Sequence, residues 1–254
     1  MTADAPPPDF SIVVPVFDEE GAAAGLAREI ATAFAGTAFE VLFVDDASRD
    51  GTLASLVALG AEIPQLRALS HARNAGQSRA VRTGVLAARG AIIVTLDGDG
   101  QNDPADAPRL AEALKAAPPT LGLIGGERVK RQDSAAKRLA SRLANGFRRR
   151  LLRDNAVDTG CGLKAFRREA FLRLPYFDHI HRYLPALMLR EGYQIAFQPV
   201  GHRARRSGRS KYTNLGRLWA ALSDLMGVVW LIRRARSPGP VREGAALHGP
   251  GETG

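Results

Sequence analysis

Four short apolar runs that alternate with helix-like stretches constrain the fold of this chain most strongly. The apolar runs, rich in branched side chains, lie at residues 10–16, 39–44, 66–69 and 91–96. The stretches between them are rich in alanine and leucine and lie at residues 20–34, 52–59 and 76–88. Runs that are apolar nearly throughout are typical of strands covered on both faces, as in a parallel sheet. The alternation predicts βαβ units and an α/β fold with a mostly parallel, Rossmann-like sheet.

Length and composition indicate one large folded domain. The chain has 254 residues, of which 45% are hydrophobic and 24% charged, and these values exclude a disordered or fibrous protein. The single cysteine, Cys161, excludes a disulfide framework and a cysteine-rich zinc module. We expect a disordered N-terminus at 1–9, the main domain at 10–214, an amphipathic helix at 215–236 and a disordered tail at 237–254.

Charge is divided unequally between the two halves of the chain. Residues 1–127 carry 9 Lys and Arg against 17 Asp and Glu, whereas residues 128–254 carry 26 against 9, which leaves a net charge of +9. This asymmetry indicates a polyanionic partner, which could be nucleic acid, anionic lipid or a phosphorylated substrate. Composition alone does not choose among these three.

Acidic segments follow three of the predicted strands, at residues 15–20, 45–52 and 97–104. Ligands of open parallel sheets collect at the carboxyl ends of the strands, so all three segments should open onto one edge. An isolated Asp-x-Asp is more often a solvated turn, but the two companion acidic segments favour a site. Carboxylates brought together there suit Mg²⁺ or Mn²⁺, held by Asp97 and Asp99 with Gln101 as an added oxygen ligand.

The middle acidic segment offers both structural and binding roles. Asp50 could cap the following helix or form the turn before it, or it could contact a ligand. The sequence favours neither role over the other. Asp45 and Asp46, at the end of the strand itself, are better placed to accept hydrogen bonds from a base or ribose. After the first strand, Pro15 fixes the backbone, and Phe17 could then lie against a nucleobase.

The segments VPVFDEEG, VDDASRDGT and LDGDGQNDP, in this order and spacing, resemble family 2 glycosyltransferases, which have the nucleotide-diphosphosugar (GT-A) fold. The chain is most similar to the dolichol-phosphate mannose synthase group, which glycosylates polyprenyl phosphates, and the similarity runs from about Phe10 to Tyr212. The resemblance makes 10–214 the catalytic domain. It implies nucleotide contacts at Pro15, Phe17, Glu19, Asp45, Asp46 and Asp97, and metal ligands at Asp97, Asp99 and Gln101. Phe17-Asp18 replaces the usual Tyr-Asn of the family.

The same resemblance gives the basic half of the chain a role, because a donor diphosphate and an acceptor phosphate are both anionic. Arg128 matches the phosphate-facing arginine of the family. Gly208 to Tyr212 resembles a loop that closes over the diphosphate, which implies nucleotide contacts by Ser210 and Lys211. Further phosphate or acceptor contacts are expected from Lys137, Arg138, Ser141, Arg203 and Arg206. The expected catalytic residues are Asp99, Asp158 and Arg128.

Asp158 matches an acidic position of the family and could act as a general base. However, a phosphate acceptor is already ionised at neutral pH and barely requires deprotonation. We therefore favour a role for Asp158 in orienting Lys164 or the acceptor site.

The most apolar stretch, Leu218 to Ile232, has 15 residues, fewer than the roughly 20 that cross a bilayer. Leu218, Leu222, Leu225, Val229 and Ile232 share one helical face. With flanking arginines and two tryptophans, the helix at 215–236 is predicted to lie at a membrane surface, and the alternative is packing on the domain or in a homodimer. Residues 1–9 show no positively charged, apolar leader, so we expect a cytoplasmic protein, peripheral on the inner face of the cell membrane.

These observations predict an Mg²⁺- or Mn²⁺-dependent glycosyltransferase, and the resemblance implies that it inverts the anomeric configuration. It would move a sugar from a nucleotide-diphosphate donor, GDP-mannose-like or a UDP-sugar, to a polyprenyl or dolichyl phosphate. One alternative is a transferase that acts on a polysaccharide or protein hydroxyl. A non-enzymatic binder of anionic membranes or nucleic acid would explain the charge but not the acidic segments, which would repel nucleic acid.

Overall fold

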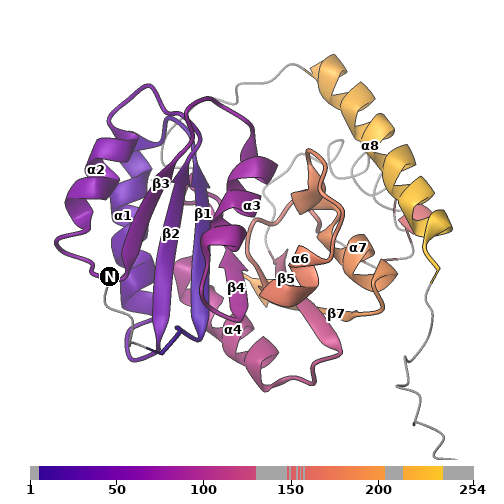
Figure 1. Ribbon diagram of the computed structural model, residues 1–254, viewed down its shortest axis with the longest axis horizontal. Coiled ribbons are helices and arrows are strands. Elements are labelled where there is room, and N and C mark those ends of the chain that lie inside the picture. Colours follow the sequence, from indigo (N-terminus) through magenta and orange to yellow (C-terminus); the bar gives the residue numbers. More distant parts are fainter. Residues whose placement is uncertain are drawn as a thin grey trace, which may run out of the picture.

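The computed structural model describes residues 6–129, 158–203 and 214–236, together with residues 148, 150–152, 154 and 156. The predicted α/β fold is confirmed by a seven-stranded sheet with the strand order β3-β2-β1-β4-β6-β5-β7 (Figure 1). The strands are β1 (Phe10–Val16), β2 (Phe39–Asp45), β3 (Leu66–Ser70), β4 (Ile92–Thr95), β5 (Leu121–Arg128), β6 (Lys164–Arg167) and β7 (Gln194–Val200). All neighbours pair in parallel except β6, which is antiparallel to both β4 and β5.

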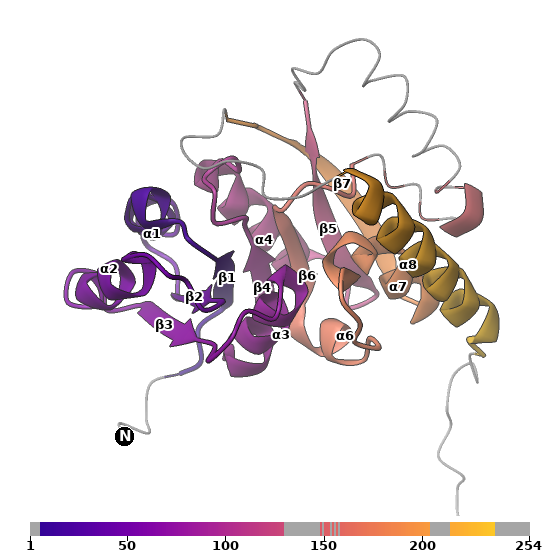
Figure 2. The same ribbon diagram turned by 90° about the horizontal axis from the view of Figure 1, so that it is seen from above.

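Helices cover both faces of the sheet (Figure 2). One face carries α1 (Glu20–Ala33), α2 (Thr52–Leu59) and α4 (Ala107–Ala116), which follows the short 3-10 helix η1 (Pro104–Asp106). The other face carries α3 (Gln77–Ala87), α6 (Arg168–Leu172), the 3-10 helix η2 (Ile180–Arg182), α7 (Leu184–Arg190) and α8 (Asn214–Arg234).

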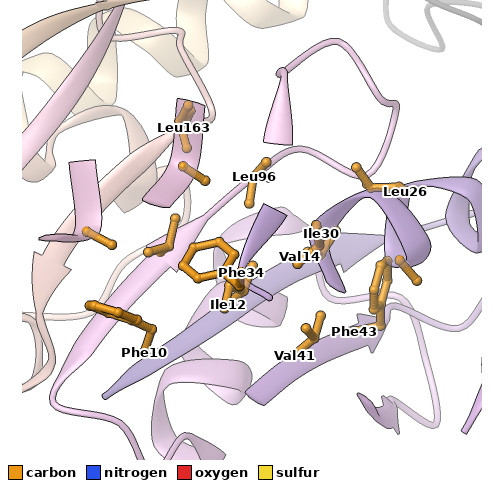
Figure 3. Packing of buried hydrophobic residues seen from close by; sticks show 14 of the residues in the cluster. Phe10, Ile12, Val14, Leu26, Ile30, Phe34, Val41, Phe43, Leu96 and Leu163 are labelled. Atoms are coloured by element: carbon orange, nitrogen blue, oxygen red, sulfur yellow. The ribbon is translucent and has the colours of Figure 1, made fainter. Parts of the chain in front are cut away.

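The buried strands supply side chains to both faces, as their continuous apolar sequences predict. On β1, Ile12 and Val14 join the cluster of α1, α2 and α4 (Figure 3), and Val13 joins the cluster of α3 on the other face. Phe34 packs between Phe10 and Phe39 with ring centroids 5.9 and 5.8 Å away. This two-sided burial fixes the strand ends at which the site lies.

The parallel strands β1, β2 and β4 end at the same edge of the sheet. Because β6 is antiparallel, it begins at this edge, where Lys164 pairs with Thr95 of β4. Lys164 is thereby placed next to the acidic segment that follows β4.

Several predicted elements differ from the observed ones or lie outside the described residues. The sequence of residues 179–191 predicts one helix, but the structure divides it into η2 and α7. His179 precedes η2 in a left-handed conformation with φ of 63°, and Pro185 stands in the first turn of α7. The sequence also predicts a basic helix at 134–152, which lies mostly outside the described residues. It predicts a mobile loop at 201–214, and most of this segment lies outside them too.

Helix α8 packs on the domain by part of the apolar face that was predicted to lie at a membrane surface, as in the alternative of packing on the domain. Leu225, Val228 and Val229 are buried against the α7 side of the domain, and Asp224 accepts a 2.8 Å hydrogen bond from Nδ1 of His179. The side chains that remain exposed form a second apolar stripe of Leu222, Met226 and Trp230. No helix among the described residues has the length and apolar character needed to span a bilayer.

Candidate active site

A cleft of about 270 Å³ opens at the carboxyl ends of β1, β2 and β4. Six residues that the sequence singled out line it: Pro15, Phe17, Glu19, Asp46, Asp97 and Asp99. The other lining residues are Val16, Asn74, Gly76, Gln77, Ala80 and Gly98. The prediction that acidic segments from separate strands meet at one edge therefore holds for these side chains.

Asp97 and Asp99 form the acidic centre of the cleft. Gln77 Nε2 donates a 2.8 Å hydrogen bond to Asp97 Oδ1, and the backbone N–H of Gln101 donates to Asp99 Oδ1 at 3.1 Å. Burial raises the pKa of the Asp97 carboxyl above its ordinary value, and the charge of Asp99 raises it further. A bound cation would relieve both penalties.

The donor set fits a divalent cation that arrives with substrate phosphates. The described residues contain no group of three or more His, Cys, Asp or Glu side chains able to hold a metal. Mg²⁺ is commonly held by one or two carboxylates together with substrate phosphates and water, and Asp97 and Asp99 supply such a pair. Gln101, the third predicted ligand, does not line the cleft.

Two glycines let the acidic loop approach its neighbours closely. A Cβ at position 98 would lie 2.6 Å from Val16 Cγ1 and 2.7 Å from the Pro15 carbonyl oxygen. A Cβ at position 162 would overlap the carboxylate of Asp97. The backbone of Gly162 is held from the other side, because Thr95 Oγ1 donates to its carbonyl at 2.8 Å. The carboxylate of Asp97 thus occupies the space that a side chain at position 162 would need.

Asp46 shapes the wall of the cleft. Its carboxylate accepts hydrogen bonds from the backbone N–H groups of Ala75 and Gly76, at 2.9 and 2.7 Å, and lies 2.7 Å from Nδ1 of His71. Position 76 requires glycine, because its backbone φ is +88°. The carboxylate predicted to contact a nucleotide therefore also fixes the 74–76 turn.

The neighbouring acids have structural partners. Asp45 does not line the cleft and bonds Ser48 and Ser70. Asp50 accepts from the backbone N–H groups of Thr52, at 3.0 Å, and Glu20, at 3.3 Å, so it forms the turn and ties the second loop to α1. Of the two roles predicted for Asp50, the structure shows the one in forming the turn.

Comparison with known proteins identifies the chain. The model of the family described as "Glycosyl transferase family 2" matches residues 11–174. The chain belongs to glycosyltransferase family 2. A dodecaprenyl-phosphate galacturonate synthase of Rhizobium johnstonii is 33% identical over 237 residues, which cover 91% of this chain and 69% of that protein. An undecaprenyl-phosphate 4-deoxy-4-formamido-L-arabinose transferase of Pseudomonas aeruginosa is 36% identical over 220 residues, which cover 85% of this chain and 63% of that protein.

Solved structures support the GT-A fold of the transferase. A glucosyl-3-phosphoglycerate synthase of Mycobacterium tuberculosis, crystallised with Mn²⁺, UDP-glucose and glycerol 3-phosphate, superposes with a TM-score of 0.66. Sequence identity is 20%, and the match covers 91% of this chain and 82% of that one. This likeness concerns the fold. The transferase spans 62 to 69% of the length of the curated relatives named here and of a related transferase of Edwardsiella ictaluri.

Asp158 and Arg128 of the transferase pair with each other. Arg128 Nε donates to Asp158 Oδ2 at 2.6 Å and a terminal guanidinium nitrogen donates to Oδ1 at 2.7 Å, with side-chain exposures of 14% and 6%. The hydrogen bond to Asp158 raises the pKa of Arg128. Neither residue lines the cleft.

Arg203 lies away from the cleft, on the acidic loop and α1. Its guanidinium pairs with Glu29 and, at 2.7 Å, with Asp103, and its backbone N–H donates to the Gln101 carbonyl at 2.9 Å. The structure thus places this predicted phosphate ligand in a structural ion-pair network. The other predicted phosphate, acceptor and nucleotide contacts of the basic half lie outside the described residues: Lys137, Arg138, Ser141, Arg206, Ser210 and Lys211.

The sequence reasoning missed one wall of the cleft. Asn74, Gly76, Gln77 and Ala80 line it from the segment that follows β3. This segment carries no acidic motif, but its position after a parallel strand and its glycine before a helix are signals that could have indicated it.

Proposed function

We propose that this transferase moves a sugar from a nucleotide-diphosphate donor to a polyprenyl phosphate, in one displacement with inversion at the anomeric carbon. The observation that carries the proposal is the cleft with its Asp97–Asp99 pair in a chain 33 to 36% identical to enzymes named for dodecaprenyl and undecaprenyl phosphate. These relatives are longer than this chain, and their activity is assigned to it here as a proposal.

The donor would lie along the sheet edge. Phe17, over which the Arg49 guanidinium lies at 5.9 Å, offers an aromatic face to the base at one end of the cleft. Asp97 and Asp99 would hold Mg²⁺ or Mn²⁺ against the diphosphate. The bound cation would neutralise the charge that develops on the departing nucleoside diphosphate. Gln77 keeps the Asp97 carboxylate oriented by its 2.8 Å hydrogen bond.

The contacts of Asp158 bear on the choice of acceptor. A hydroxyl acceptor requires a base, whereas the carboxylate of Asp158 is held at both oxygens by Arg128. A phosphate monoester is already ionised, so its oxygen can attack the anomeric carbon while the bond to the donor diphosphate breaks and its electron pair leaves with the nucleotide. No proton has to be transferred in this step. The Asp158–Arg128 pair therefore favours a phosphate acceptor over a polysaccharide or protein hydroxyl.

A peripheral membrane location follows from the acceptor and from α8. The exposed stripe consists of Leu222, Met226 and Trp230, exposed by 46, 60 and 61%. Exposed Arg233 and Arg234 follow it at the end of the helix. An apolar stripe with a tryptophan and adjacent cations suits an anionic membrane surface. We infer that this stripe, which shares only Leu222 with the face predicted from the sequence, meets lipid at the inner face of the cell membrane.

The test is sugar transfer from labelled donors, UDP-glucose, UDP-galacturonate and GDP-mannose among them, with Mg²⁺ or Mn²⁺. Undecaprenyl phosphate and undecaprenol are offered as separate acceptors. We expect a lipid-linked product with the phosphate and none with the alcohol. A labelled polysaccharide or protein without a lipid product would contradict the proposal.

A further inference from the structure

A second, smaller chamber of about 20 Å³ adjoins the cleft. It shares Pro15, Gln77 and Asp97 with the cleft, and its remaining lining residues are Val81, Thr95, Leu96, Gly162, Lys164, His181 and Leu184. Its volume exceeds the roughly 10–15 Å³ that one water requires but is far too small for a whole sugar ring or a phosphate. Only a substituent of a larger ligand can enter it.

The order of the strands places this chamber beyond the diphosphate end of the cleft. Phe17 follows β1, Asp97 follows β4 and Lys164 begins β6, and these strands are consecutive neighbours in the sheet. A donor with its base at Phe17 and its diphosphate at Asp97 and Asp99 therefore extends its sugar toward β6. This step rests on the proposed function.

Lys164 brings a buried cation to the chamber. The residue is 5% exposed, and its Nζ donates to the carbonyl of Cys161. Burial lowers the pKa of Lys164, and the charges of Asp97 and Asp158 raise it in part, but among the described residues neither carboxylate forms an ion pair with this ammonium, which has three donors. A buried ammonium with one carbonyl partner is costly, and an oxygen acceptor on a ligand would offset part of that cost.

His181 contributes a neutral ring to the same chamber. Its Nδ1 lies 2.7 Å from Oγ of Ser78, which is fully buried in α3. Burial lowers the pKa of His181 well below its ordinary value, and the charges of Lys164, Arg182 and His179 lower it further. The imidazole is therefore neutral at pH 7, with one N–H donor and one acceptor nitrogen.

We propose that Lys164 and His181 form the subsite for the transferred sugar and bind an oxygen-bearing substituent of its ring in the chamber. The two residues would contact the donor directly and select its sugar. Gln77, which lines both spaces, would sit where the diphosphate meets the sugar.

The test compares the affinity for a nucleoside diphosphate with that for the corresponding nucleotide sugar, by calorimetry in Mg²⁺. UDP, UDP-glucose and UDP-glucuronate serve as one probe set, and GDP with GDP-mannose as the other. For Lys164→Met and His181→Phe we expect affinity for the diphosphate to stay within about twofold. Affinity for the sugar nucleotide should fall about tenfold, which corresponds to about 1.4 kcal/mol. Lys115→Met, at a lysine with a 45% exposed side chain paired with Asp9, is the matched control and should change neither.

Equal losses for diphosphate and sugar nucleotide, or no loss of either, would overturn the subsite. If a variant fails to fold, Lys164→Gln and His181→Gln, which keep a polar side chain but remove the ammonium and the imidazole, provide the same comparison. A wild-type protein that binds neither diphosphate nor sugar nucleotide would instead contradict the proposed function, so the two failures are distinguishable.

Discussion

The carboxylate of Asp158 is bound at both oxygens by the guanidinium of Arg128, over distances of 2.6 and 2.7 Å. The pair is mostly buried, and paired groups of this kind are costly to break from one side. The position expected to supply a base or an orienting carboxylate thus supports the end of β5.

Asp158→Asn should therefore act mainly on stability. We expect the free energy of unfolding to fall by about 3 kcal/mol or more, because Arg128 loses its charged partner. Urea denaturation measures this, and Glu62→Gln, which breaks the exposed Arg28–Glu62 pair, should cost less than about 1 kcal/mol. The pH profile of the remaining transfer should keep its shape. A stable variant whose rate of sugar transfer no longer rises with pH would show instead that Asp158 is a general base.

Gly162→Ala should displace the acidic centre, because the new Cβ would overlap the Asp97 carboxylate. We expect cation-dependent nucleotide affinity to fall at least about tenfold, or about 1.4 kcal/mol. Gly25→Ala in α1 is the control, since a Cβ there meets nothing within 4 Å and alanine favours a helix by about 0.5–1 kcal/mol. Unchanged nucleotide affinity in Gly162→Ala would show that Asp97 is not held as the structure places it.

Glu40 should make the fold sensitive to acid at the end of the sheet opposite the site. Burial raises the pKa of this carboxyl, but hydrogen bonds from Arg89, Ser11 and Arg67 outweigh it and leave the pKa below its ordinary value. Such a group stabilises the fold above its unfolded pKa, and the contribution is lost as pH falls through the folded value.

Glu40→Gln should thus lower the free energy of unfolding at pH 7 by about 1–3 kcal/mol. The difference between wild type and variant should shrink as the pH is lowered below about 4. Urea denaturation at several pH values measures both. A difference that stays constant over this pH range would contradict the role given to the Glu40 charge.

The exposed stripe on α8 should govern membrane binding. Met226→Ser with Trp230→Ser should weaken co-sedimentation with phosphatidylglycerol vesicles at least about tenfold, since each large apolar side chain contributes about 1.5–3 kcal/mol when buried. Val57→Ser, at a 63% exposed valine on α2, is the control and should have no effect. Undiminished vesicle binding, or a change of oligomeric state instead, would assign the stripe to another partner.

The regular part of the fold was predictable because local signals and burial agree there. The strands of the first half lie within one residue of the apolar runs, since β1, β2 and β4 are buried on both faces and β3, at the edge of the sheet, is partly buried. The antiparallel direction of β6 was not predictable, because an apolar run carries no information on strand direction. The apolar face of α8 was assigned to lipid, yet Leu225 and Val229 pack on the domain. Hydrophobic periodicity marks a buried face without saying what buries it.

The site was predictable as far as topology determines it. Acidic segments after parallel strands had to meet at one edge, and Asp46, Asp97 and Asp99 do so. What the sequence could not supply is which charges find partners within the fold. Arg203 pairs with Glu29, which lies 174 residues away in the chain, and no local sequence pattern predicts that contact.

The central claim is that Asp97 and Asp99 bind a nucleoside diphosphate through a divalent cation in one cleft. Calorimetric titration of UDP and GDP, with and without Mg²⁺ or Mn²⁺, tests it directly. The wild-type protein should take up one of the two nucleotides at least about tenfold more tightly with the cation. Asp97→Asn and Asp99→Asn should lose this gain while remaining folded, whereas the control Asp9→Asn should keep it. Uptake of equal strength without a cation, or a full cation effect in both cleft variants, would contradict the account.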